Sequence, residues 1–493
     1  MNNQISSNPD QNLEIAIIGA GISGLCMAIN LRKAGITTFK IFEKSDNVGG
    51  TWHDNTYPSC GCDTPSILYS FSFEPKSDWT RHFPKQPEIL EYLEHCSKKY
   101  DIRKHITFNT EISSAFFDSE KNIWRIYSAS GEEFSANILV SGCGQLNKPK
   151  IPHLDGLETF SGTQFHCARW NHEHDLKDET VAVIGTGASA IQFIPIIAEQ
   201  VKKLIVFQRS APWIAPKPDF KFTNFIHWLG KSFPFILRFY RWLLYLVLEY
   251  FVVYLTIKQN TIVGKLVSTF LNFQREKIIK DENLKSILKP NYEVGCKRIL
   301  ISNDYYPALQ LPNVEVVAQD IKGINQNQII TKEGREYPVD TLIFATGFDT
   351  KLLSSIKIVG LNNQLLQDKW QDGAEAYKGI MIPEFPNLFM LYGPNTNTGT
   401  QSIIFMVECQ VNYIISCIKM MQNKSQKYLD VKPDINSEYN QKLQVAASQT
   451  VWNSGCSSWY KTKTGKIVNN WPFSTVRYWL TTSQADPKDF NFS

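Results

Sequence analysis

The stretch LEIAIIGAGISGL, residues 13–25, decides the fold of this chain. It begins with an apolar run of strand length, meets Gly19, Gly21 and Gly24, and continues with apolar residues at helical spacing. Glycines at this spacing let the backbone approach a pyrophosphate, and the helix that follows offers free amides and the positive end of its dipole. The stretch therefore predicts a strand, a tight turn and a helix that bind a dinucleotide.

A carboxylate in the expected place strengthens this prediction. The next strand, residues 39–43, ends in Glu43, on the order of 20 residues after the last glycine, where an acid accepts hydrogen bonds from ribose hydroxyls. The alternative, a tight structural turn without a ligand, explains the glycines but not the acid.

A second copy of the pattern lies at TVAVIGTGASAIQFIPIIAEQ, residues 180–200, where Gly185, Gly187 and Ser189 precede another helix. No acid follows the next strand; Arg209 and Ser210 stand there instead. An arginine can pair with a phosphate on the adenosine ribose, which favours NADPH over NADH. A solvated Arg209 at a strand end is the alternative.

Two such units in one chain predict FAD at the first and NADPH at the second, because a flavin supplies redox chemistry that side chains lack. The expected fold class is α/β, with two Rossmann-like dinucleotide-binding domains and an α-helical insertion. The expected segments are the FAD domain at 1–148 and 348–493, the NADPH domain at 149–211 and 293–347, and the insertion at 212–292.

Composition excludes several other classes of protein. The chain has 493 residues, 43% of them hydrophobic, which excludes disorder throughout. Lys and Arg number 51 against 47 Asp and Glu, so no nucleic-acid partner is expected. The ten cysteines lack the spacing of a disulfide scaffold and predict reduced thiols. No metal site is expected, because His172 and His174 lie in a polar stretch typical of a solvated loop.

The apolar segment WLLYLVLEYFVVYLTI, residues 242–257, tests whether the chain enters a membrane. It is shorter than the roughly 20 residues that span a bilayer, and Glu249 near its middle adds a penalty of about 2.5–3.5 kcal/mol. We therefore expect a buried helix, leave contact with a membrane surface open without predicting it, and disfavour a span. The polar start MNNQISSNPDQN has no signal-peptide pattern, so a cytoplasmic location is expected.

Residues 160–171, FSGTQFHCARWN, carry a more specific pattern. Phe160, Gly162, His166 and Trp170 match F-x-G-x-x-x-H-x-x-x-W-[PD], and Asn171 departs from its last position. This pattern is the fingerprint of the class B flavin monooxygenases, and the chain resembles their Baeyer-Villiger branch. Relatives that oxygenate only nitrogen or sulfur usually carry Tyr or Phe where Trp170 stands.

A second family pattern, [AG]-G-x-W-x-x-x-x-[FY]-P-[GM]-x-x-x-D, is similar to residues 49–63, with Ser59 as the departure. Together with residues 346–347, 393–395 and 458–460, the resemblance covers nearly the whole chain. It implies further cofactor-binding residues, namely Gly50, Thr51, Trp52, Asp63, Tyr69 and Trp459.

The resemblance also implies roles for residues 295–298, GCKR. Arg298 stands where the family has its active-site arginine, Lys297 where members hold the NADPH phosphate, and Asp63 would lie beside Arg298. A guanidinium keeps its charge at neutral pH and can stabilise an anionic peroxide and the oxygen of a tetrahedral centre. His166 would couple domain movement to turnover. A surface Arg298 and a turn-capping Asp63 are the alternatives.

The expected activity follows from this resemblance. NADPH reduces FAD, O2 adds to it, and the flavin peroxide inserts one oxygen beside a ketone carbonyl to give an ester or lactone. A heteroatom monooxygenase acting on thioethers or amines is the alternative, and a flavin-bound interaction or membrane-associated protein without turnover is a second. The sequence predicts neither the natural substrate nor the oligomeric state.

Overall fold

The computed structural model describes residues 13–253, 261–399 and 401–492. The first glycine motif begins a parallel sheet with the order β19-β7-β1-β2-β3. Its central strand pairs along its whole length with both neighbours and is fully buried. The strands of this sheet are β1 (Ile15–Ile18), β2 (Phe39–Phe42), β3 (Ile106–Thr107), β7 (Ile138–Ser141) and β19 (Leu388–Met390).

Helices from both ends of the chain cover this sheet. α1 (Ile22–Lys33), which follows the glycine turn, lies against α12 (Ile403–Asn423), and α14 (Thr475–Thr481) packs on α12 in turn. Among the described helices, α12 is the one with the length and apolar composition of a membrane span, which is weak evidence because more than half of its apolar window is buried inside the molecule. Its place beside α1 is that of a core helix.

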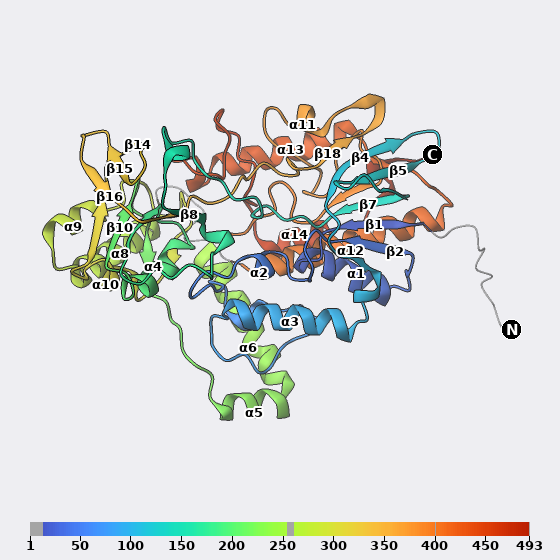
Figure 1. The fold of residues 1–493 in the computed structure, drawn as a ribbon. Coiled ribbons are helices and arrows are strands. Elements are labelled where there is room, and N and C mark those ends of the chain that lie inside the picture. Colours follow the sequence, from blue (N-terminus) through green and yellow to red (C-terminus); the bar gives the residue numbers. More distant parts are fainter. Residues whose placement is uncertain (1–12, 254–260, 400, 493) are drawn as a thin grey trace.

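The second glycine motif begins another parallel sheet, with the order β13-β10-β9-β17-β8. Figure 1 shows the two sheets side by side, with this one at the left and the first at the right. Its strands are β8 (Thr163–His166), β9 (Thr180–Ile184), β10 (Lys203–Phe207), β13 (Val314–Val317) and β17 (Thr341–Phe344), and α4 (Ala190–Ala198) follows β9. The sequence prediction of an α/β fold with two dinucleotide-binding units is confirmed.

Two smaller sheets complete the units, one of them mixed and the other antiparallel. β4 (Ile112–Asp118), β5 (Ile123–Ser128) and β6 (Glu133–Ala136) form a meander that β18 (Lys357–Val359) extends. β18 and β19 come from the last third of the chain, so that third returns to the first unit. β14 (Ile321–Ile324), β15 (Gln328–Thr331) and β16 (Glu336–Pro338) form the other sheet, beside the second unit.

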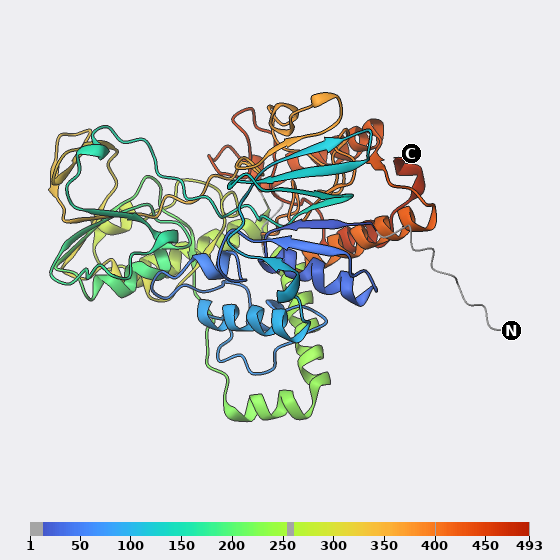
Figure 2. The same cartoon turned by 45° about the vertical axis from the view of Figure 1, so that its right-hand side comes forward.

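A helical insertion separates β11 (Ile214–Ala215) from β12 (Leu300–Ile301), which pair with each other. It contains α5 (Asn224–Ser232), α6 (Pro234–Leu246), the π-helix η6 (Val247–Val253), α8 (Ile262–Ile278) and α9 (Glu282–Ile287). Figures 1 and 2 show α5 and α6 as an arm that projects away from both sheets.

The prediction of a buried helix at residues 242–257 is wrong for the part that the structure describes with side chains. Trp242 is 56% exposed, Val247 47% and Tyr250 63%. The single acid of the segment, Glu249, is 3% exposed and accepts hydrogen bonds from the amide and hydroxyl of Thr475 at 2.6 and 2.8 Å. Residues 254–257 lie outside the described residues.

Candidate functional site

The first glycine turn lies at the carboxyl end of β1. A Cβ on Gly24 would collide with the carbonyl oxygen of Gly19, so the turn closes only with glycine here. Gly21 stands at the N-terminus of α1, where no side chain caps the helix, and its amides are left for a ligand. Glu43 is 4% exposed and accepts a hydrogen bond from the amide of Ala20, within the turn, at 2.6 Å. These residues fit a dinucleotide.

The second pattern of the family lies against this turn. A Cβ on Gly50 would come within 3.1 Å of the Cα of Gly21, and Thr51 begins the short helix α2 (Thr51–Asp54). Trp52 donates from Nε1 to the hydroxyl of Tyr69 at 3.1 Å, and the two rings meet edge to face at 5.6 Å. Both side chains are under 9% exposed, so they form a closed wall beside the turn.

The second glycine turn is more open than the first. A Cβ on Gly185 would meet the carbonyl oxygen of Ala345 at 2.5 Å, whereas a Cβ on Gly187 would meet nothing within 4 Å. Protein packing therefore does not require glycine at Gly187, but a pyrophosphate that approaches the backbone does. The side chain of Ser189 does not cap α4, but the amides of Ile191 and Gln192 already donate to the carbonyls of Gly187 and Ser189, so fewer free amides face a ligand here than at α1.

Two cationic side chains gather where the sequence predicts the extra phosphate of NADPH. Lys297 donates to the hydroxyl of Ser210 at 3.0 Å, and its ammonium lies 4.5 Å from the ring centre of Tyr292. Burial lowers the pKa of Lys297, and the positive charge of Arg209 lowers it further. A phosphate placed between Lys297 and Arg209 would relieve this repulsion.

Arg298 and Asp63 form a two-pronged ion pair. Nε of Arg298 donates to Oδ2 of Asp63 at 2.9 Å and Nη2 donates to Oδ1 at 2.6 Å, while the side chains are 34% and 23% exposed. The charge of Asp63 raises the pKa of Arg298 still further above its usual range. Burial alone would raise the pKa of Asp63, but the charge and hydrogen bonds of Arg298 outweigh it and lower that pKa. Both groups are therefore charged at neutral pH.

A residue that sequence reasoning missed fixes the loop that carries Asp63. Gln192 on α4 accepts at Oε1 from the amide of Gly61 at 3.1 Å and from the hydroxyl of Tyr57 at 3.3 Å. Its Nε2 donates back to the carbonyl of Gly61 at 3.1 Å. A polar residue inside an otherwise apolar helix was the available signal. Gln192 thus joins the second unit to the loop of the first.

The departure from the second family pattern, Ser59, has a structural account. Ser59 adopts a positive φ of 64°, a conformation that favours glycine, the residue that the pattern allows at this place. Lys85 holds the strained serine by donating to its hydroxyl at 2.7 Å and to its carbonyl at 3.2 Å.

The fingerprint residues do not form one cluster, because Phe160 and Trp170 pack into different hydrophobic clusters. A Cβ on Gly162 would come within 2.6 Å of the ring of Phe160, so this pair is a packing contact. His166 at the end of β8 is 4% exposed, accepts at Nδ1 from the amide of Ala168 and has its pKa lowered by burial. His166 is neutral at physiological pH.

Trp170 connects the fingerprint segment to the Asp63 loop through rings. Its ring lies 5.3 Å from that of Phe193 on α4, which in turn lies 6.0 Å from Tyr57. Asn171 accepts a hydrogen bond from the amide of Glu173 at 3.1 Å, as an aspartate would, so the departure at this position keeps the local turn.

A disulfide between Cys296 and Cys456 corrects the expectation of reduced thiols for this pair. It joins the segment of Lys297 and Arg298 to the loop before Trp459 across a sequence separation of 160 residues. Trp459 is 38% exposed and its ring lies 5.1 Å from that of Tyr460, which is buried. The other cysteines among the described residues are free thiols, most of them buried.

The two histidines of the polar loop bond to separate partners. His172 is 2.7 Å from the hydroxyl of Thr56, while His174 is 3.1 Å from Glu179 and 2.8 Å from Thr341. In the part of the chain with described side chains, no three His, Cys, Asp or Glu residues are grouped as metal ligands.

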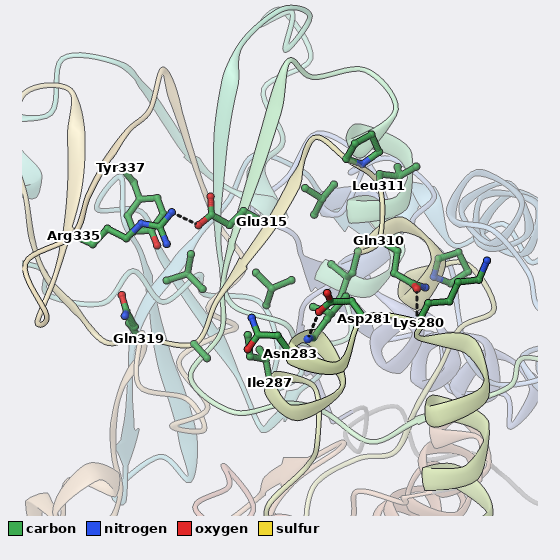
Figure 3. A pocket seen from close by; sticks show the side chains of 18 residues that line it. Lys280, Asp281, Asn283, Ile287, Gln310, Leu311, Glu315, Gln319, Arg335 and Tyr337 are labelled. Carbon is green, nitrogen blue, oxygen red and sulfur yellow. Dashed lines mark hydrogen bonds and ion pairs between the residues drawn. The ribbon is translucent and has the colours of Figure 1, made fainter.

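A surface groove of about 950 Å³ lies elsewhere, along β13 at the edge of the second sheet (Figure 3). Lys280 and Asp281 line one end and Arg335 and Glu315 the other, where they form an ion pair. None of the residues named above as candidates lines this groove. The candidate site consists of the two glycine turns and the Arg298–Asp63 pair, none of which belongs to this groove.

Comparison with known proteins extends these observations. The family model described as flavin-binding monooxygenase-like matches residues 12–451. A protein named Baeyer-Villiger monooxygenase from Pseudomonas aeruginosa (strain PAO1) is 42% identical over 496 residues, covering 100% of this chain and 94% of the relative.

Solved structures with the same fold are similar over almost the whole chain. The structure of an oxidized steroid monooxygenase bound to NADP has a TM-score of 0.87 at 30% identity and covers 97% of this chain and 99% of its own. The structure of OTEMO in complex with FAD and NADP has a TM-score of 0.88 at 25% identity and covers 98% of this chain and 99% of its own.

Proposed function

This chain belongs to the flavin-binding monooxygenase-like family, and we propose that it catalyses a Baeyer-Villiger oxidation with FAD and NADPH. One oxygen atom of O2 is inserted beside the carbonyl of a small-molecule ketone, and an ester or lactone is released. The observation that carries this proposal is the ion pair of Arg298 and Asp63, which joins the loop at the end of the second family pattern to the segment before β12 and holds a permanent positive charge there.

The two turns divide the cofactors between the units. Residues 1–148 and 348–493 would hold FAD, with the first glycine turn on its pyrophosphate and Glu43 on its ribose. Residues 149–211 and 293–347 would hold NADPH, with Gly187 on its pyrophosphate. Arg209, Ser210 and Lys297 would bind its additional phosphate. When bound, FAD takes hydride from NADPH and activates O2, which no side chain can do.

Arg298 would act on the reacting atoms through its charge. A guanidinium does not lose its proton at neutral pH, and Asp63 makes that loss harder still. The positive charge stabilises the negative charge that develops on the carbonyl oxygen as the ketone becomes tetrahedral. Asp63 is a positioning residue, because its two hydrogen bonds fix the plane and direction of the guanidinium.

The steroid monooxygenase among the similar structures supports a large apolar ketone as the substrate class. The buried rings of Trp52 and Tyr69 contact each other beside the first turn, and we propose that they add apolar surface to the site. We place the enzyme in the cytoplasm, where NADPH is regenerated.

The test is a product assay with isotopic oxygen. FAD-loaded protein, NADPH and labelled O2 are incubated with cyclic, aryl and long-chain ketones and one thioether, and the products are analysed by mass. We expect one labelled oxygen in an ester or lactone, and we expect Arg298→Ala to abolish this product. Labelled sulfoxide with unreacted ketones would instead identify a heteroatom monooxygenase.

A matched control separates the role of Arg298 from general loss of an ion pair. Arg335 also pairs with a carboxylate, Glu315, but lies at the edge of the second sheet. Arg335→Ala should leave the yield of ester unchanged. An equal loss in both variants would remove the support for a catalytic Arg298.

A further inference from the structure

The arm, residues 220–250, contains α5 and α6, which extend away from both sheets (Figures 1 and 2). A long connection leads from β11 to α5, and α6 returns toward the body of the molecule, where it contacts the short helix η2 (Ser66–Leu68). The end of the arm that is far from the body of the molecule is therefore not covered by the two sheets.

The amphipathicity of α6 is reversed relative to that of a helix on a water-soluble protein. Phe235, Phe239, Trp242 and Leu243 are 66%, 61%, 56% and 44% exposed. Their spacing of four, three and one residues places them on one face of the helix. The outward face of α6 is therefore an apolar stripe.

Three polar side chains of the same segment, those of Arg241, Tyr245 and Glu249, are bonded to the body of the molecule. Arg241 donates to the hydroxyl and to the carbonyl of Ser70, both at 3.0 Å. Tyr245 lies 2.7 Å from the hydroxyl of Thr475, and Glu249 accepts from the same hydroxyl and from its amide. These contacts fix which face of α6 is turned outward, so the fold itself holds the apolar stripe in an exposed position.

The stripe continues along the rest of the arm. On α5, Phe225 is 66% and Trp228 56% exposed, and their rings stack at 5.9 Å. Phe233 between the helices is 41% exposed, with its ring 6.1 Å from those of Trp228 and Phe235. The aromatic side chains thus contact one another across the exposed end of the arm, as one continuous surface. Such a surface is larger than single apolar residues scattered on a soluble protein.

The charges on the arm have one sign. Lys221, Lys231 and Arg238 are exposed. Glu249 is the one acid between residues 220 and 250, and it is buried in the contact with Thr475. Exposed aromatic rings bordered by lysine and arginine, without an exposed carboxylate, complement the surface of a bilayer that contains anionic lipids.

We propose that the arm, residues 220–250, docks the protein on the surface of an anionic lipid bilayer. The aromatic stripe enters the boundary between headgroups and acyl chains, and the cations bind lipid phosphates. The arm lies on the membrane rather than spanning it, because its inward face is bonded to the body of the protein. A second copy of this chain fits less well, since a symmetric pair of arms would bring like charges together.

Flotation with lipid vesicles tests this proposal on the full-length, FAD-loaded protein. Vesicles of equimolar phosphatidylcholine and phosphatidylglycerol should carry the wild-type protein upward in a density gradient. The variant Phe235→Ser, Phe239→Ser, Trp242→Ser should bind at least about tenfold more weakly, because three apolar anchors are lost. The control Val445→Ser, which removes a residue 62% exposed on α13 (Pro433–Ser448), should float like the wild type.

A charge variant separates the two parts of the interaction. Lys231→Glu with Arg238→Glu should weaken binding to the mixed vesicles but not to vesicles of phosphatidylcholine alone, and added salt should act in the same direction. Hydrogen exchange should slow in residues 224–250 when vesicles are added. Retained FAD absorbance in each variant confirms that the protein is folded.

Three results would overturn the proposal. The first is wild-type protein that stays at the bottom of the gradient with both kinds of vesicle. The second is equal flotation of the wild type and the aromatic variant. The third is a vesicle-free dimer that the aromatic substitutions dissociate, which would assign the stripe to a second copy of the chain.

Discussion

The carboxylate of Asp63 and the guanidinium of Arg298 meet across 235 residues of sequence, one from a loop beside the first glycine turn and the other from a segment just before β12. Their paired hydrogen bonds make this contact a charged link between the two nucleotide-binding units. Several expectations depend on it.

Replacing Arg298 should separate NADPH consumption from oxygenation. In Arg298→Lys, a single ammonium replaces the fork and cannot keep both bonds to Asp63. We expect the rate of ester formation to fall about 100- to 1,000-fold, as for the loss of one oxyanion-stabilising donor. Oxidation of NADPH, followed at its absorbance maximum, should fall much less. Equal loss of both rates would contradict a role limited to the oxygen-transfer step.

The contribution of Asp63 to stability should depend on pH. Its pKa is lowered in the folded protein, so the stabilisation is present above the unfolded pKa of about 3.9 and is lost as the pH falls through the folded pKa. At neutral pH, Asp63→Asn should lower the free energy of unfolding by on the order of 2 kcal/mol, less than for a fully buried pair. Denaturant titrations should show the difference from wild type shrinking below about pH 4. A difference that grows on acidification would refute this assignment.

Arg209 and Lys297 should distinguish NADPH from NADH. Each contributes a charge-assisted contact to the extra phosphate, so either alanine variant should raise the KM for NADPH about 10- to 100-fold. The KM for NADH should change little. Steady-state kinetics with both nucleotides measure this, and equal effects on the two would show that these side chains do not bind that phosphate.

Substitutions at Gly187 and Gly24 test whether glycine in the second turn is required by a bound nucleotide rather than by protein packing. Gly187→Ala should leave the melting temperature unchanged, because its Cβ meets no protein atom within 4 Å. The same variant should bind NADPH more weakly, since the methyl group would occupy the path of the pyrophosphate. Gly24→Ala serves as the contrast: its Cβ collides with Gly19, so it should fail to retain FAD. Unchanged NADPH affinity in Gly187→Ala would refute the proposed position of the nucleotide.

The Cys296–Cys456 disulfide should stabilise the protein strongly, because it closes a loop over a sequence separation of 160 residues. Cys456→Ser should lower the free energy of unfolding by up to roughly 5 kcal/mol. The double variant with Cys296→Ser should lose no more than this single variant, since both remove the same bond. Mass analysis of peptides from non-reduced protein detects the link directly; alkylation of both thiols without reductant would show that it is absent.

The parts of the fold that depend on local signals could be predicted from the sequence. Residues 15–18 and Gly19 to Gly24 specify a strand and turn through neighbouring residues alone, and both glycine motifs begin parallel sheets as expected. The pairing of Asp63 with Arg298 came from family resemblance, because no periodicity connects residues so far apart.

Two errors have physical causes. The apolar composition of the segment from Trp242 predicts burial. Composition alone does not say whether an apolar helix face packs against the protein or faces outward. Here the hydrogen bonds of Glu249 hold the polar face against the body of the protein. The thiols of Cys296 and Cys456 were expected to be reduced because sequence spacing gives no sign of a link that tertiary contact alone creates.

The hydrogen bonds between Gln192 and Gly61 have a thermodynamic consequence. Gln192 lies on the helix whose N-terminus faces the second turn, and Gly61 lies in the loop that carries Asp63. If binding of NADPH favours this contact and thereby tightens the binding of FAD by some factor, then FAD must tighten the binding of NADPH by the same factor, because thermodynamic linkage is reciprocal. Gln192→Ala should therefore reduce the mutual dependence of the two dissociation constants from both directions at once.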